Sequence, residues 1–228
     1  MPLRVAVAGL GAIGAIHARN AMASEHMRLV AVASSDARRV GDHAAALGGG
    51  VVGTTVDRLR NEVDVDPVIV ASQTADHLAH ARPQLERGRQ VFLEKPGAVT
   101  LNVHAELTDL AARSGSVVVT GYVRRYDPDF AGLKRLVDDG AVGEPVHVSL
   151  VAREVVVPPA ARDRAGGFIV DLGVHDFDIA AWILGQEPVE AYTVVQRAAQ
   201  PQLRFDSAVI TVRFDPRLRR PLRVRPAS

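Results

Sequence analysis

A lysine followed by a proline stands where a short apolar run ends. Residues 90–93 are predicted to form a buried strand, and Glu94-Lys95-Pro96 follows it directly. The proline holds Lys95 in an extended backbone. A lysine fixed at a sheet edge can donate a hydrogen bond to a substrate hydroxyl and stabilise an alkoxide as it forms. Composition alone favours an ordinary surface lysine at this position, so a catalytic interpretation of Lys95 depends on the residues that accompany it.

An aspartate and a histidine four positions apart form a second group with chemical potential. Asp171 and His175 lie in residues 166–178, a stretch that begins with two glycines. On a helix this spacing puts both side chains on one face, with roughly 5–6 Å between their β-carbons. The carboxylate can then orient the ring and stabilise its protonated form, which suits proton transfer near neutral pH. The alternative is that Asp171 caps a helix and His175 fills the core.

Three glycines near the start of the chain have the spacing of a phosphate-binding turn. Gly9, Gly11 and Gly14 follow a short apolar run and precede an alanine-rich stretch. The first glycine allows a tight turn, the second lets the backbone approach a pyrophosphate, and the third lets the helix pack closely on the strand. The phosphates would sit on N–H groups at the helix N-terminus. We predict a dinucleotide site that includes Ala12 and Ile13. The alternatives are a glycine turn without a ligand and an S-adenosylmethionine site.

The end of the second predicted strand bears on the choice of cofactor. In NAD-binding folds an acidic residue about 20 positions past the glycines holds the ribose 2′-OH. Here that position is Ser34, followed by Ser35 and Asp36, with Arg38 and Arg39 close behind. Hydroxyls and guanidinium groups suit a 2′-phosphate, which favours NADP. The alternative is that the arginines are solvated and Asp36 reaches the 2′-OH, which would favour NAD.

Strands and helices alternate through the first 120 residues, which predicts a doubly wound parallel sheet with right-handed crossovers. Ligands bind such sheets at the carboxyl ends of the strands. The polar loop after the strand at 68–71 carries Ser72 and His77, and Glu94 follows the strand at 90–93. We therefore predict that these three residues contribute to the cofactor site. His17 also lies on the cofactor side.

The glycine turn, Glu-Lys-Pro and Gly-Gly-x-x-x-Asp-x-Gly-x-His occur here in that order. This combination resembles the Gfo/Idh/MocA family of NAD(P)-dependent oxidoreductases, which act on sugars, polyols and related compounds, and the resemblance covers residues 3–214. It implies a Rossmann domain followed by an α+β substrate domain. It also implies that His175 takes the proton of a substrate hydroxyl, Asp171 supports His175, and Lys95 orients the oxygen while hydride passes to the nicotinamide.

Residues 121–128 resemble a stretch of the inositol dehydrogenase branch of this family, which implies that Arg124 or Arg125 contacts substrate. A structural ion pair is the alternative for both. That branch would have His-Arg-Asn where this chain has Ala152-Arg153-Glu154. Arg153 stays a candidate substrate contact, and the two departures favour a polyol or sugar other than inositol itself.

Residues 121–215 are predicted to form an incomplete α+β domain with a mainly antiparallel sheet. Helices are expected at 129–138 and around 171–183, and strands at 146–151, 190–196 and 207–214. The apolar spacing of Ile179, Trp182 and Ile183 supports the second helix. From residue 216 the sequence turns rich in arginine and proline. We expect residues 216–228 to be a disordered tail, of frameshifted or prematurely ended origin, so a catalytically inactive nucleotide-binding remnant is the competing reading.

Composition limits the remaining function classes. The formal charge of +1 gives no reason to expect a nucleic-acid or anionic-membrane partner. The chain has no cysteine, which excludes disulfides and thiolate chemistry and suits the cytoplasm. The N-terminus passes directly into a predicted strand and lacks the pattern of a secretory signal peptide. No histidine stands at metal-ligand spacing from other metal-ligating side chains, so no metal site is predicted. We expect a cytoplasmic enzyme that forms homo-oligomers through the sheet of its second domain if that sheet is whole.

Overall fold

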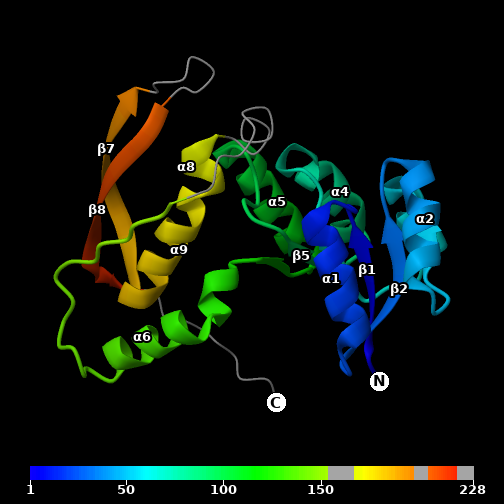
Figure 1. The fold of residues 1–228 in the computed structure, drawn as a ribbon, viewed down its shortest axis with the longest axis horizontal. Coiled ribbons are helices and arrows are strands. Elements are labelled where there is room, and N and C mark those ends of the chain that lie inside the picture. Colours follow the sequence, from blue (N-terminus) through cyan, green and yellow to red (C-terminus); the bar gives the residue numbers. More distant parts are fainter. Residues whose placement is uncertain (154–166, 198–204, 220–228) are drawn as a thin grey trace. The chain divides into compact units, whose positions relative to one another are not determined.

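The computed structural model describes residues 1–153, 167–197 and 205–219, and these form two compact units (Figure 1). The first unit comprises Met1–Gly121, and the second begins at Tyr122. Each unit has its own sheet: six strands in the first and two in the second. Each is therefore described by itself.

The first unit is built on a parallel sheet with the strand order β3-β2-β1-β4-β5-β6. Its strands are β1 (Leu3–Ala8), β2 (Met27–Ala33), β3 (Val52–Thr54), β4 (Pro67–Val70), β5 (Gln90–Leu93) and β6 (Val118–Thr120). The order reverses beside β1, because the chain moves outward to β2 and β3 and then returns to β4. This arrangement confirms the predicted doubly wound fold, and the switch point lies where the glycine turn begins.

Helices cover both faces of this sheet because every second residue of a buried strand points to the same side. In β1, Val5 and Val7 belong to one hydrophobic core and Ala6 and Ala8 to the other. The first core includes residues of α1 and α2, and the second includes residues of α3, α4 and α5. These helices are α1 (Ala12–Ala23), α2 (Ala37–Leu47), α3 (Val56–Glu62), α4 (His77–Leu85) and α5 (Leu101–Ser114), with a short 3₁₀ turn, η1 (Thr74–Asp76), before α4.

Capping residues set the helix boundaries. The Thr55 hydroxyl accepts the N–H of Arg58 at the start of α3, and the Thr100 hydroxyl accepts that of Val103 at the start of α5. Gly115 ends α5 with a φ of +67°. Threonine at the N-cap and a left-handed glycine after the last turn are standard helix signals. These two signals set the ends of α5 at Leu101 and Ser114.

The second unit combines helices with an antiparallel ribbon. Its elements are η2 (Val123–Tyr126), α6 (Pro128–Asp138), α8 (Phe168–Asp171), α9 (Gly173–Leu184), β7 (Gln186–Arg197) and β8 (Phe205–Arg219). Asp127 caps α6 by accepting the N–H of Asp129 at 2.9 Å. In α9, Ile179 and Ile183 are buried as their spacing predicts, and the ammonium of Lys134 lies 5.9 Å from the centre of the Trp182 ring.

One predicted strand is wrong. Residues 146–151 have no regular secondary structure. Val148 and Leu150 are less exposed than Val146 and Val151, so the alternation of burial is present. A strand also needs a hydrogen-bonded neighbour, and no strand of the described ranges pairs with this segment. The antiparallel sheet therefore has two strands in the described residues, where three were expected.

The expectation of a disordered tail from residue 216 is also wrong for its first four residues, because β8 continues to Arg219. The register passes from Glu187 opposite Asp215 to Gln186 opposite Arg219. The residues of β8 between Asp215 and Arg219 therefore form a bulge. A strand tolerates a proline such as Pro216 at a bulge. Residues 220–228 lie outside the described residues, so the rest of that expectation stays a prediction.

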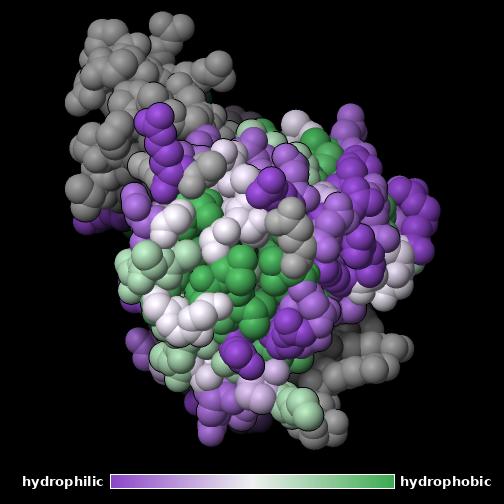
Figure 2. Space-filling model, turned by 90° about the vertical axis from the view of Figure 1, so that its right-hand side faces the viewer, coloured by the Kyte–Doolittle hydropathy of each residue, from purple (hydrophilic) through white to green (hydrophobic). Residues whose placement is uncertain are grey.

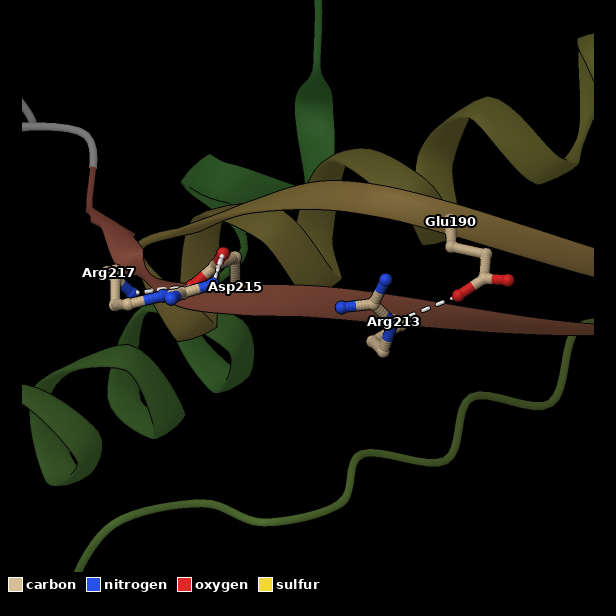
Figure 3. Close-up of polar contacts among 4 residues, drawn as sticks. All are labelled: Glu190, Arg213, Asp215 and Arg217. Carbon is tan, nitrogen blue, oxygen red and sulfur yellow. Dashed lines mark hydrogen bonds and ion pairs between the residues drawn. The ribbon is translucent and has the colours of Figure 1, made fainter.

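Ion pairs lie along this ribbon (Figure 3). Arg213 Nε donates to Glu190 Oε2 at 3.0 Å across the two strands, and Arg217 binds Asp215 through its backbone and its guanidinium at 2.8–3.0 Å. The hydrogen bonds from Arg217 lower the pKa of Asp215 to about 2. The Asp215 contacts brace the bulge that contains Pro216.

Some hydrophobic surface stays exposed. Figure 2 shows a face on which a hydrophobic area is bordered by hydrophilic side chains. Exposed hydrophobic residues include Ile13 and Ile16 on α1 and Tyr192 and Val209 on the ribbon. Across the described part of the chain, none of the helices has the length and hydropathy to span a membrane.

Candidate functional site

The glycine turn follows β1 directly. Gly9 has a φ of +101°, and a β-carbon there would lie 2.5 Å from the backbone nitrogen of Ser72. A β-carbon at Gly14 would overlap the carbonyl oxygen of Gly9. Both positions therefore require glycine for packing within the protein. By contrast, a β-carbon at Gly11 would meet no atom within 4 Å, so its backbone faces open space.

The start of α1 is suited to hold an anion. Gly11 is the N-cap of this 12-residue helix, and no side chain caps the helix N-terminus. The N–H groups in the first turn of a helix have no intrahelical acceptors, and the helix dipole favours negative charge there. Gly11, Ala12 and Ile13 are exposed, whereas Gly14 is buried against the turn. These residues fit the diphosphate of a dinucleotide.

At the end of β2, two side chains organise the entry into α2. Ser34 Oγ accepts the N–H of Asp36 at 3.1 Å, and Asp36 Oδ1 accepts the N–H of Arg38 at 3.0 Å. The Asp36 carboxylate is thus used at the N-terminus of α2. Ser35 and Arg38 are exposed, and the side chain of Arg39 lies outside the described residues.

The loop after β4 is held by two histidines of α4. The ring of His77 is 1% exposed, and its Nε2–H donates to the carbonyl oxygen of Ser72 at 3.2 Å. His80 Nδ1 lies 2.9 Å from Ser72 Oγ. Burial lowers the pKa of both histidines. The rings thus support the loop from the interior, and the predicted roles of Ser72 and His77 in cofactor binding stay predictions.

The residues after β5 connect Lys95 to α1. His17 Nε2 donates to Glu94 Oε1 at 2.7 Å, and the N–H of Lys95 donates to Glu94 Oε2 at 3.0 Å. Burial raises the pKa of Glu94, but the hydrogen bonds from His17 and Lys95 and their positive charges outweigh it, so the net shift is downward. The His17 ring also packs against Phe92 in a T-shaped arrangement, with 5.3 Å between the ring centroids and 66° between the ring planes.

In the second unit, Asp171 and His175 stand on either side of a break. The sequence predicts one continuous helix, but α8 ends at Asp171 and α9 begins at Gly173. Leu172 keeps right-handed helical dihedrals, with φ −94° and ψ −45°, and the N–H of His175 donates to its carbonyl at 3.2 Å. Both candidate residues are partly buried. Their shared helical face stays a prediction.

Arg124 and Arg125 are engaged in ion pairs within the second unit. Arg124 pairs with Asp176, and Arg125 holds Asp178 in a two-point contact that includes an Nε–Oδ2 bond of 2.8 Å. Both arginines thus form the structural ion pairs that the sequence pattern leaves open as the alternative to a contact with substrate. Their predicted contact with substrate is untested. Arg153 is exposed in a segment without regular structure.

Sequence reasoning missed two pairings in the first unit: His17 with Glu94, and His80 with Ser72. His17 stands three residues after Gly14, and His80 three residues after His77. Helical spacing places each histidine one turn from a candidate residue, so the spacing was a usable signal. The partners themselves, Glu94 and Ser72, lie in the loops after β5 and β4, and which helix side chain meets each loop depends on the folded arrangement.

A parallel sheet with its glycine turn after the first strand defines a dinucleotide-binding Rossmann unit, here joined to a smaller α+β unit. A model described as an oxidoreductase family with an NAD-binding Rossmann fold matches residues 3–122, and a model of the GFO/IDH/MocA C-terminal domain matches residues 130–219. The chain belongs to the Gfo/Idh/MocA oxidoreductase family.

Known relatives cover most of this chain. Inositol 2-dehydrogenase of Rhizobium meliloti is 30% identical over 92% of the chain, and inositol 2-dehydrogenase 2 of Saccharopolyspora erythraea is 36% identical over 84%. The crystal structure of a putative myo-inositol dehydrogenase from Sinorhizobium meliloti is 26% identical over 93%, with a TM-score of 0.82. The matches span 64%, 56% and 65% of those proteins, so the chain covers less than two thirds of each.

Proposed function

We propose that this chain is a nicotinamide-dependent oxidoreductase that acts on a CH–OH group of a polyol or sugar. The observation that carries the proposal is the position of Lys95. It follows β5 in the same unit as the glycine turn, and Glu94 and His17 connect it to the helix that begins at that turn. A lysine whose backbone is held at this point can bring its ammonium group to a bound dinucleotide, and an ammonium group there can stabilise an alkoxide.

The first unit has the groups that a dinucleotide needs. Gly11 leaves room for a pyrophosphate, and the exposed start of α1 offers N–H donors to it. When bound, the nicotinamide supplies hydride transfer. The other steps belong to the protein: His175 takes the hydroxyl proton, Asp171 orients and stabilises the charged ring, and Lys95 holds the oxygen. The proposal requires that both units act on one substrate.

We favour NADP over NAD. Ser34 stands where an acidic residue would bind the 2′-OH, and a serine brings no negative charge against a 2′-phosphate. The Asp36 carboxylate is engaged at the start of α2, and the exposed Arg38 lies on the first turn of that helix. A guanidinium there suits a phosphate.

The substrate class follows from the relatives, several of which are inositol dehydrogenases. We propose a cyclic polyol or sugar, with Arg124, Arg125 and Arg153 as candidate contacts. Ala152 and Glu154 replace the histidine and asparagine of the inositol-type pattern, which argues for a substrate other than inositol. A cysteine-free composition suits a cytoplasmic site for this reaction.

The test combines binding with turnover. Purified protein is titrated with NADH and NADPH, and NAD(P)H absorbance is then followed while polyols and sugars are offered with oxidised cofactor. We expect binding and turnover, and at least a 10³-fold loss of kcat in Lys95→Met and His175→Asn with nearly unchanged cofactor affinity. His26→Ala, at an exposed histidine, is the control. Binding without turnover on a broad panel would instead favour an inactive nucleotide-binding remnant.

A further inference from the structure

His17 has no step of its own in the proposed reaction, although its contacts reach the candidate catalytic lysine. It lies on α1, three residues after the last glycine of the turn, and its side chain is 20% exposed. Its Nε2 donates to Glu94 Oε1 at 2.7 Å. The partner belongs to the loop after β5, 77 positions away in the sequence. The contact thus joins the nucleotide-binding helix to the loop of the candidate catalytic lysine.

Glu94 passes this contact on to Lys95. One carboxylate oxygen binds His17, and the other accepts the backbone N–H of Lys95 at 3.0 Å. The backbone N–H of Glu94 in turn donates to the carbonyl of Val70 at 2.9 Å. A carboxylate with both oxygens engaged has little freedom to rotate. The backbone at this point is therefore held twice: at the N–H of Lys95 by the Glu94 carboxylate, and at the N–H of Glu94 by the carbonyl of Val70.

The packing around the pair restricts it further. The His17 ring packs against the Phe92 ring in a T-shaped contact. A β-carbon at Gly121 would lie 2.8 Å from Phe92 Cζ and 3.4 Å from Glu94 Oε1. The carboxylate is therefore enclosed by an aromatic ring on β5 and the backbone after β6. Glu94 is 17% exposed, so its hydrogen bonds are largely shielded from competing water.

We propose that His17 is a positioning residue: through Glu94 it fixes the backbone of Lys95 relative to the glycine turn, so that the ammonium group is set against the bound cofactor. This inference rests on the proposed function for its consequence in catalysis. The positional part concerns the free protein and stands independently. A misplacement of about 1 Å at a reacting group can cost about 100-fold in rate, so such a link would matter.

The experiment compares the full-length protein with His17→Leu, which removes the donor, and His17→Gln, which keeps an N–H donor. Amide hydrogen exchange of Lys95 is measured by NMR, with the buried strand residue Val7 as reference. We expect exchange at Lys95 to rise at least tenfold in His17→Leu, with Val7 unchanged. His17→Gln should return it to within threefold of the original protein. His26→Ala, an exposed histidine, should change neither.

Kinetics then separates positioning from general stability. In His17→Leu we expect kcat to fall about 10- to 100-fold, while the NADH dissociation constant and substrate KM stay within about threefold. If His17→Leu does not fold, His17→Asn, whose shorter amide does not reach Glu94, replaces it with the same expectations. Unchanged exchange at Lys95, or an equal rise at Lys95 and Val7, would overturn the inference. If the original protein shows no turnover, the proposed function fails, and the exchange data still decide the role of His17.

Discussion

At the scale of single residues, Glu94 is where several contacts of the first unit meet. It binds a side chain of α1, the N–H of Lys95 and the carbonyl of Val70, and it is largely buried. A buried carboxylate stays charged only when its hydrogen bonds offset the loss of hydration. The lowered pKa of Glu94 reflects that balance, and it makes the charge itself a source of stability.

We predict that Glu94→Gln destabilises the protein in a pH-dependent way. A group whose pKa is lower in the folded state stabilises the fold above its unfolded-state pKa, here about 4.5, and loses that effect as pH falls through the folded value. We expect a loss of about 1.5 kcal/mol at pH 7, the size of a hydrogen bond to a charged group. Urea unfolding at several pH values should show this difference shrinking below pH 4.5, and Glu25→Gln, at an exposed carboxylate, should show none.

A second prediction at this scale concerns cofactor choice. Ser34→Asp places a carboxylate at the end of β2, where it would repel a 2′-phosphate and accept a hydrogen bond from a 2′-OH. We expect the dissociation constant for NADPH to rise at least tenfold, about 1.4 kcal/mol, while that for NADH falls or stays constant. Fluorescence titration with both cofactors measures this shift. Asn20→Asp adds the same charge on the exposed side of α1 and is the control. Equal effects on both cofactors would contradict the assignment of Ser34 to the 2′ position.

At the scale of elements, local signals located most helices and strands of both units, and they failed in the second unit where an element depends on a distant partner. The sequence predicts strands at 3–8 and 27–33 and a helix at 101–114. The structure has β1, β2 and α5 with these bounds, because buried runs and capping residues are local signals. Residues 146–151 show the right alternation and still form no strand, since pairing depends on a partner elsewhere in the chain. The break after Asp171 and the bulge around Pro216 depend in the same way on packing and register.

The glycine turn gives a prediction at this scale through two contrasting substitutions. Gly14→Ala should destabilise the protein by about 3 kcal/mol, because the new methyl group would overlap the carbonyl of Gly9. Gly11→Ala should leave stability the same or slightly higher, because Gly11 has a φ of −73° and open space beside it. That methyl group would occupy the space of the pyrophosphate, so we expect NADH affinity to fall at least tenfold.

Thermal unfolding and NADH titration of the two variants check this contrast. The expected result is a stability defect for Gly14→Ala and a binding defect with normal stability for Gly11→Ala. If Gly11→Ala binds NADH as well as the original protein, the cofactor does not approach the turn at Gly11. The dinucleotide site would then need another location.

At the scale of the whole molecule, the antiparallel ribbon presents an apolar face. Tyr192, Val194 and Val209 share that face, because Val194 lies opposite Val209 in the register and strand side chains alternate. Tyr192 and Val209 are 70% and 67% exposed. By the same alternation, Glu190 and Arg213 lie on this side of the ribbon, and they form an ion pair across the two strands (Figure 3). A hydrophobic strip bordered by charges is typical of a protein contact surface.

We predict that the protein forms a homo-oligomer through this face. Size-exclusion chromatography with light scattering should give a multiple of the chain mass for the original protein. Val194→Lys combined with Val209→Lys should reduce it to the monomer, because two charges in the middle of an apolar contact are costly to bury. Leu101→Lys, at an exposed leucine of the first unit, should leave the mass unchanged. A monomeric original protein at high concentration would contradict the prediction, and the strip would then be available to a different chain.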